Sequence, residues 1–372
     1  MTNGLGSLRS RIGVASLLAT LGCLHCGDDG VDDKPSPGDA GESAGGGGAE
    51  PSNGGAPAGM GSGGTELAPG GSGGAETLPS GGAGGASELV PEGEHYGFVI
   101  DTMMIPTNNN QARELAFDLN GDGVPDNQLG AVFGTLAVMG LETGTEELVE
   151  SGVVILLVDL QTTSFSRAAA AGFNTFYGTN PVPDPCVDDG DCGRHLDGTG
   201  SFDLTDDELE GEPCIGPIED GVFSGTGGAL PVRIAYSGQP LDLTLSEAHV
   251  ELTGLSEDGF TTGRIGGLLT VARIDTQLVP GMHAAVAASI AADCTGASPS
   301  PACGCVEGST GSTNLNLYDM DDDCEVSLEE VKENTLTASL LAPDVYLDGD
   351  GTADGLSVGF GVTGKRATFE LP

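Results

Sequence analysis

Acidic side chains spaced two residues apart are the clearest chemical feature of the sequence. The segment DLNGDGVPD places Asp118, Asn120 and Asp122 at positions 1, 3 and 5, and Asp126 at position 9. Oxygens at this spacing converge when the chain curls, glycine at position 6 permits the turn, and the position-7 carbonyl, here that of Val124, adds a ligand. Ca²⁺ takes about six to eight oxygens. We therefore predict a calcium loop, with a solvated acidic turn as the alternative.

This first loop resembles the D-x-[DN]-x-D-G-x-x-D calcium loops of thrombospondin type-3 repeats and dockerins. Its position 12 is Leu129, where a complete EF-hand loop has a bidentate acid. The resemblance therefore covers the first nine positions only.

The second acidic segment, DMDDDCEVSLEE, resembles an EF-hand loop at positions 1, 3, 5, 8, 9 and 12. Its oxygen donors at positions 1, 3, 5, 7, 9 and 12 belong to Asp319, Asp321, Asp323, Glu325, Ser327 and Glu330. Position 6 is Cys324, where the family has glycine. A residue with a side chain costs roughly 1 kcal/mol in that turn, and a disulfide at Cys324 would hold it in place.

A helix is expected after the second loop but not before it. Ser327 and Glu330 have the spacing of a capping box, which predicts a helix over Ser327–Leu341. The preceding segment, Gly311–Leu317, is polar and irregular, so no entering helix is expected. The second loop would then correspond to the second half of an EF-hand.

A third segment, LDGDGTAD, matches the first loop from position 3 onward. It supplies Asp348, Asp350 and Asp354, but Tyr346 stands at position 1. Asp344 is the candidate to replace the missing acid. Solvated acidic turns are the alternative here, as for the other two loops.

Cysteine usage predicts disulfides and therefore an oxidising compartment. Six of the nine cysteines are candidates for pairing: Cys186, Cys192, Cys294, Cys303, Cys305 and Cys324. Cys186 and Cys192 can close a tight loop. Cys303 and Cys305 are too near each other in sequence to pair comfortably, so we expect them to reach Cys294 and Cys324.

Zinc binding is the alternative for Cys186 and Cys192, with His195 as a third ligand. This set lacks a fourth ligand and the ordinary spacing of structural zinc sites. Cys214 and Cys26 have no clear partner.

Residues 1–22 predict an export signal. Arg9 and Arg11 precede an apolar run over residues 12–21, which is too short to span a bilayer. The run ends in TLGC, which resembles a bacterial lipobox and implies lipidation of Cys23. Simple secretion and a retained anchor are the alternatives.

Residues 23–92 predict a disordered tether that is acidic and rich in glycine, alanine and proline. Between residues 27 and 92 there is no aromatic residue, and Lys34 is the only basic one. Such a segment cannot bury enough apolar surface to offset the entropy lost on ordering.

Residues 93–372 are long enough for a sizeable core and predict one folded, β-rich domain, within which 295–372 would form a calcium-loop subregion. Helical spacing or alanine-rich composition predicts helices over Leu129–Leu141, Glu146–Glu150 and Pro280–Asp293. Apolar and β-branched runs predict strands over Tyr96–Ile105, Val153–Leu160, Leu230–Tyr236, Leu241–Leu245, Ala248–Leu252, Gly263–Ile274, Leu356–Val362 and Ala367–Leu371. The fold class is α+β and β-dominated, an antiparallel β-sandwich or open barrel with a few peripheral helices.

Charge excludes one class of partner. The chain has 56 acidic and 12 basic side chains, and its net charge of −44 repels phosphate backbones. We therefore expect no nucleic-acid partner, and contact with a membrane only through a lipid anchor. Enzyme signatures are weak, because no local Ser/His/Asp motif stands out and carboxylate pairs are too numerous to single out one.

Taken as a whole, the chain resembles a group of large secreted lipoproteins of myxobacteria. The shared features are the Cys-ended signal, the acidic tether, and the strings FDLNGDGVPDNQLG, HLDGTGSF and LDGDG. This resemblance implies a cell-envelope location and carries no activity. We expect a tethered, calcium-stabilised domain with a binding or structural role and an envelope protein or glycan as partner. The alternatives are an envelope hydrolase acting on glycan or peptide, and a module that docks through its calcium loops.

Overall fold

The computed structural model describes residues 90–136, 141–187, 190–205, 211–236, 238–296 and 303–372. The expected export signal, Cys23, Cys26 and the tether up to residue 89 lie outside these residues. Within the described part of the chain, no helix combines the length and apolar character that a membrane crossing requires.

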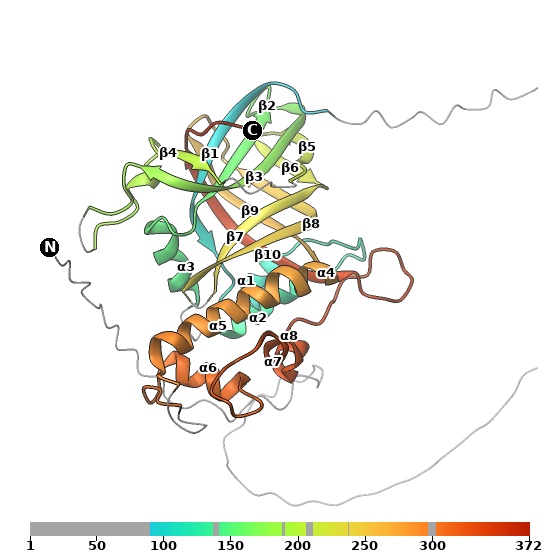
Figure 1. Cartoon of the computed structure of the whole chain (residues 1–372). Coiled ribbons are helices and arrows are strands. Elements are labelled where there is room, and N and C mark those ends of the chain that lie inside the picture. Colours follow the sequence, from blue (N-terminus) through green and yellow to red (C-terminus); the bar gives the residue numbers. More distant parts are fainter. Residues whose placement is uncertain (1–89, 137–140, 188–189, 206–210, 237, 297–302) are drawn as a thin grey trace, which may run out of the picture. The chain divides into compact units, whose positions relative to one another are not determined.

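Eight antiparallel strands form a sheet that closes on itself (Figure 1). Around the ring they are β1 (Glu94–Met104), β2 (Leu156–Thr162), β3 (Ala168–Val182), β5 (Cys214–Glu219), β6 (Val222–Thr226), β8 (Gln239–Thr253), β9 (Gly259–Thr270) and β10 (Gly355–Arg366). β10 then pairs with β1, and each neighbouring pair is antiparallel. The predicted β-dominated antiparallel class is confirmed, and the ring of pairings makes the sheet a closed barrel.

Two further strands extend this ring. β7 (Ala229–Tyr236) pairs with the first part of β8, and β4 (Ser201–Leu204) pairs with the end of β3. β8 is a single long strand where the sequence predicted two. Its halves are separated by an irregularity at Glu247, which has a positive φ of 45°.

Aromatic side chains occupy the main core. Phe98, Phe173, Phe223 and Phe360 come from four different strands, and each has at most 1% of its surface exposed. A barrel of eight strands is just wide enough for side chains to fill. Glycine makes room for them, since a Cβ at position 364 would lie 2.3 Å from the ring of Phe260.

The helices pack against the sheet and share its main core, and they flank the acidic loops. α1 (Asn109–Glu114) and α2 (Gln128–Leu136) flank the first loop, and α2 packs on β10. α3 (Leu141–Glu150) packs against β1 and β7, and η2 (Arg194–Leu196) lies near β1. The chain continues from β9 into α4 (Val271–Arg273), η3 (Ile274–Leu278) and α5 (Val279–Asp293). α5 contacts α6 (Thr310–Tyr318) and α7 (Leu328–Glu333), and α8 (Thr335–Leu340) follows α7.

The C-terminal segment covers a second, smaller apolar cluster. That cluster includes Val99, Leu157 and Phe202, and Phe369 packs against it. The backbone N–H of Ala367 donates to Gly97 O at 2.9 Å. The strand predicted over Ala367–Leu371 is not formed, because this segment makes an isolated bridge and does not join the ring.

Candidate metal-binding loops

The first acidic loop lies between α1 and α2 and folds around one carboxylate. Asp118 accepts hydrogen bonds from the backbone N–H groups of Asp122 at 3.1 Å and Gly123 at 2.9 Å. Asp122 in turn accepts from the Val124 N–H at 2.7 Å. At position 9, Asp126 accepts from the position-2 N–H at 2.9 Å. These bonds fold the loop back on itself.

The second loop repeats the bonds made by positions 5, 6 and 7. Asp319 accepts from the N–H groups of Asp323 at 3.1 Å and Cys324 at 3.0 Å, and Asp323 accepts from the Glu325 N–H at 2.8 Å. In both loops, therefore, the backbone N–H groups of positions 5 and 6 donate to the position-1 carboxylate, and that of position 7 donates to the position-5 carboxylate. The aligned sequences thus adopt the same local geometry.

The third loop keeps the parts of this geometry that do not need position 1. The N–H of Thr352 donates to Asp350 at 2.6 Å, and the N–H of Leu347 donates to Asp354 at 2.6 Å. Tyr346 occupies position 1, so the carboxylate that accepts two N–H groups in the other loops is replaced there by a phenol ring. This is the least complete of the three loops.

All three loops turn through left-handed backbone at positions 4 and 6. Glycine occupies both positions in loops 1 and 3, with φ between 71° and 86°. In loop 2 the same positions are Asp322, with φ 62°, and Cys324, with φ 73°. Side chains disfavour this region, so loop 2 adopts the turn against local preference.

Loop 2 brings its carboxylates closest together. One oxygen each from Asp319, Asp321 and Asp323 lies within 4.8 Å of the others. Burial, followed by the charges of Asp323 and Glu330, raises the pKa of Asp321. Crowding of this kind disfavours ionisation, and a bound cation would relieve it.

Glu330, at position 12, reaches back to the start of the loop. Its carboxylate accepts from the N–H of Met320 at 2.7 Å and from that of Ser327 at 2.7 Å. With the bond from the Glu330 N–H to the Ser327 hydroxyl, this forms the predicted capping box. Burial opposes ionisation of Glu330, but the hydrogen bonds it accepts outweigh that effect and lower its pKa.

The expectation of no helix before loop 2 was wrong, because α6 ends at Tyr318, directly before Asp319. Ser309 caps α6, and Gly311, Leu315 and Tyr318 form one buried face. The sequence did not indicate this helix because its small and polar residues give little helical signal of their own. The helix gains its stability from packing on α5. Loop 2 is therefore flanked by helices on both sides, as an EF-hand loop is.

The helix predicted after loop 2 is divided in two. α7 ends at Glu333, and Asn334 adopts non-helical backbone and caps α8. The Asn334 side chain also donates to Leu317 O at 2.8 Å, which ties the end of α7 to the end of α6.

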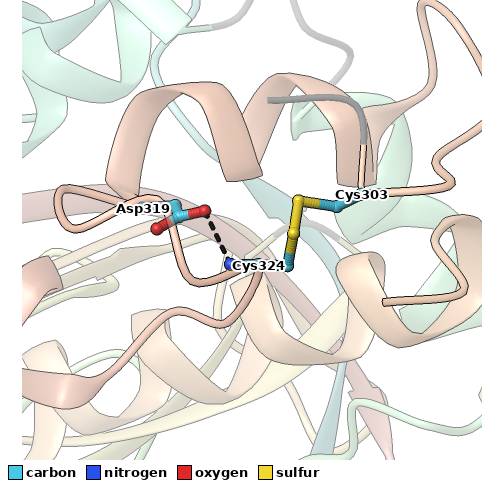
Figure 2. Close-up of side chains that lie close together, drawn as sticks. All are labelled: Cys303, Asp319 and Cys324. Carbon is cyan, nitrogen blue, oxygen red and sulfur yellow. Dashed lines mark hydrogen bonds between the residues drawn. A yellow bond between two sulfur atoms is a disulfide. The ribbon is translucent and has the colours of Figure 1, made fainter. Parts of the chain in front are cut away.

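Three disulfides use the six cysteines named from the sequence. Cys186 bonds to Cys192, Cys294 to Cys305 and Cys303 to Cys324. Figure 2 shows that the last bond lies beside the Asp319 carboxylate of loop 2. The sulfur atoms of Cys303 and Cys324 lie close enough to Asp319 for a three-ligand metal group, but their bond to each other removes them as thiolate ligands.

Asp344 does not replace the missing acid of loop 3. Its two carboxylate oxygens accept from the N–H and the hydroxyl of Ser357, at 2.7 and 2.6 Å. Ser357 also accepts from the Gln128 N–H at 2.7 Å. Burial raises the pKa of Asp126, and the charge of Asp344 raises it further, so Asp344 interacts with the end of loop 1.

A histidine–aspartate pair lies outside the loops and was not found from the sequence. His95 Nδ1 lies 2.9 Å from Asp159 Oδ2 and 3.1 Å from Oδ1. Gly97 lies opposite Asp159 across β1 and β2, so His95 and Asp159 are diagonal neighbours on one face. Burial raises the pKa of Asp159, and the hydrogen bond to His95 opposes the rise.

This pair opens into a pocket of about 340 Å³. The pocket is also lined by Glu257, Arg366 and Phe369. Because His95 uses Nδ1 on Asp159, its Nε2 is the nitrogen left for a ligand. Only the register of the two strands could have identified the pair, since the residues are 64 positions apart.

Comparison of the chain with protein-family models, with curated proteins and with solved structures found no match.

Proposed function

We propose that the protein is a calcium-stabilised, β-rich domain of the cell envelope with a binding or structural role. One observation carries the proposal: three separate segments adopt the same turn, with left-handed backbone at positions 4 and 6 and a hydrogen bond from the position-7 N–H to the position-5 carboxylate. In loops 1 and 2 the side-chain oxygens have the spacing that Ca²⁺ requires, and loop 3 lacks only the one at position 1.

In this proposal the ions fix elements that carboxylate repulsion would otherwise loosen. Ca²⁺ in loop 1 would hold α1 and α2 on β10, and Ca²⁺ in loop 2 would hold α6 and α7 on α5. The net charge of −44 makes this stabilisation large relative to a neutral domain, because each ion offsets two charges in an acidic surface.

Export to the envelope, lipidation of Cys23 and an envelope protein or glycan partner form part of the same proposal. The three disulfides support it, because such bonds persist in oxidising compartments. A partner would meet the exposed loops, where Val124, Met320 and Tyr346 each have about half or more of their surface accessible.

Thermal unfolding of the oxidised protein in millimolar Ca²⁺, in EGTA and in Mg²⁺ tests the calcium assignment. Free Ca²⁺ at about 100 times Kd adds roughly 2.7 kcal/mol per site, so we expect a Ca²⁺-selective rise of several degrees. The matched variant Asp319→Asn/Asp321→Asn/Asp323→Asn should show a smaller rise. If elemental analysis finds EGTA-treated protein free of metal and Ca²⁺ gives no shift, the assignment fails.

A hydrolase with structural calcium is the second candidate, and the His95–Asp159 pair favours it. An imidazole held by a partly buried carboxylate can act as a general base through its other nitrogen. Turnover of fluorescently labelled casein and of 4-methylumbelliferyl glycosides would test it. His95→Gln and Asp159→Asn should both abolish any turnover, whereas Arg167→Gln, which does not line the pocket, should not. Absence of turnover in the unaltered protein contradicts this candidate for peptide and glycan.

A further inference from the structure

Position 6 of the second loop holds a cysteine in backbone that favours glycine. Gly123 and Gly351 occupy this position in the other loops, with φ of 86° and 85°. Cys324 adopts φ 73° at the same position. An L-residue in this region costs about 1–2 kcal/mol, so loop 2 needs a compensating constraint.

The turn at position 6 aims a hydrogen-bond donor at a ligand carboxylate. The Cys324 N–H donates to Asp319 at 3.0 Å, and Figure 2 shows this bond next to the disulfide. Gly123 makes the same bond to Asp118 at 2.9 Å in loop 1. If Cys324 relaxed to a negative φ, the chain beyond its Cα would turn, and the position-7 carbonyl of Glu325 and the later ligands would shift relative to the Asp319 carboxylate.

The disulfide joins Cys324 to a fixed point in the core. Its partner, Cys303, is fully buried and belongs to the main apolar core. Cys303 O accepts from the Gly296 N–H at 2.9 Å, and the neighbouring bond between Cys294 and Cys305 attaches this segment to the end of α5. The anchor is therefore held independently of loop 2.

A second contact holds the loop two residues later. His283 on α5 donates from Nε2 to Val326 O at 2.9 Å. Val326 is itself 9% exposed and part of the core. The chain is thus fixed to the α5 region at positions 6 and 8.

We propose that the Cys303–Cys324 disulfide takes the place of glycine at position 6 and thereby sets the calcium affinity of loop 2. This inference rests on the proposed function, because it concerns the affinity of the same loop. Cys324 is a positioning residue: it donates no ligand atom, and it acts by holding the position-7 carbonyl and the later ligands in place relative to the Asp319 carboxylate.

Calcium titration of matched variants tests this inference. Loops 1 and 3 are first weakened by Asp118→Ala and Asp350→Ala, so that loop 2 dominates the binding isotherm. In that background, Cys303→Ala/Cys324→Ala should bind Ca²⁺ about tenfold more weakly than the disulfide-bonded protein. Cys303→Ala/Cys324→Gly should recover most of the affinity, because glycine accepts the turn without the bond.

Controls separate this inference from the calcium assignment. Cys186→Ala/Cys192→Ala removes a disulfide remote from the loop and should leave the affinity unchanged, and circular dichroism checks that each variant is folded. Equal affinity in the alanine pair and the disulfide-bonded protein would overturn the inference, as would weak binding by the glycine pair. Absence of Ca²⁺ binding in every protein, the disulfide-bonded one included, would instead refute the proposed function.

Discussion

Single side chains at position 1 organise the acidic loops. Asp118 and Asp319 each accept backbone N–H groups from positions 5 and 6. In loop 3 the same position holds Tyr346, which is 49% exposed. The three loops therefore provide an internal comparison, because loops 1 and 2 have a carboxylate at position 1 and loop 3 does not.

Replacing Tyr346 by Asp should complete loop 3. The new carboxylate would have the N–H groups of positions 5 and 6 within the turn and would add a ligand oxygen. We expect tighter Ca²⁺ binding and a larger Ca²⁺-dependent increase in melting temperature than in the unaltered protein. Tyr346→Asn is the control for loss of the ring, since it adds an oxygen without a charge. Equal melting temperatures for Tyr346→Asp and Tyr346→Asn in Ca²⁺ would contradict the prediction.

At the element scale, β10 holds the first loop in place through a buried amide. Asn127 donates to Ala112 O and Gly359 O, both at 2.9 Å. Its oxygen accepts from the N–H groups of Gly130 at 2.9 Å and Gly359 at 2.8 Å. One side chain thus joins α1, the start of α2 and β10.

Asn127→Ala should destabilise the protein by about 2–4 kcal/mol, because it leaves buried backbone groups without partners. Urea unfolding in EGTA measures this loss without a contribution from Ca²⁺. Asn120→Ala provides the comparison, since Asn120 lies in the exposed part of the same loop and should cost less than about 1 kcal/mol. A similar loss for the two variants would show that Asn127 does not link the elements.

Sequence patterns identified the elements whose signals are local. The run Val153–Leu160 predicted β2, and the alanine-rich segment predicted α5, because these residues have strong preferences of their own. β3 was missed, since its alanines, glycines and asparagine resemble a loop, and pairing with β2 and β5 decides its structure. The acidic loops could be predicted because their residues lie within a short stretch of sequence. The His95–Asp159 pair could not, because it depends on the register of β1 and β2.

At the scale of the whole molecule, acid sensitivity depends on a buried histidine. His195 is fully buried, and neither ring nitrogen meets a hydrogen-bond partner. Burial lowers the pKa of His195, and the nearby Val149 carbonyl offsets this only in part. The unfolded chain therefore takes up its proton at a higher pH than the folded chain, and stability decreases as the pH falls through about 6.5.

Between pH 7.5 and 5.5 the unaltered protein should lose more unfolding free energy than His195→Leu, by at most about 1.4 kcal/mol. Urea unfolding of both proteins in EGTA at the two pH values provides the measurement. Burial also lowers the pKa of His249, but this residue is common to both proteins and cancels in the comparison. Parallel losses for the two proteins would show that His195 is protonated equally in the folded and unfolded states.

Closure of the strand ring also constrains the order of folding. Phe98 lies opposite Arg366, so the first strand of the barrel can pair with β10 only when the end of the chain is present. The contact order is therefore high. The disulfides span only 6, 11 and 21 residues and can form within short segments before the ends meet. Local covalent closure can therefore precede the slow, long-range step, and a chain emerging progressively from a ribosome cannot complete its barrel until β10 has been released.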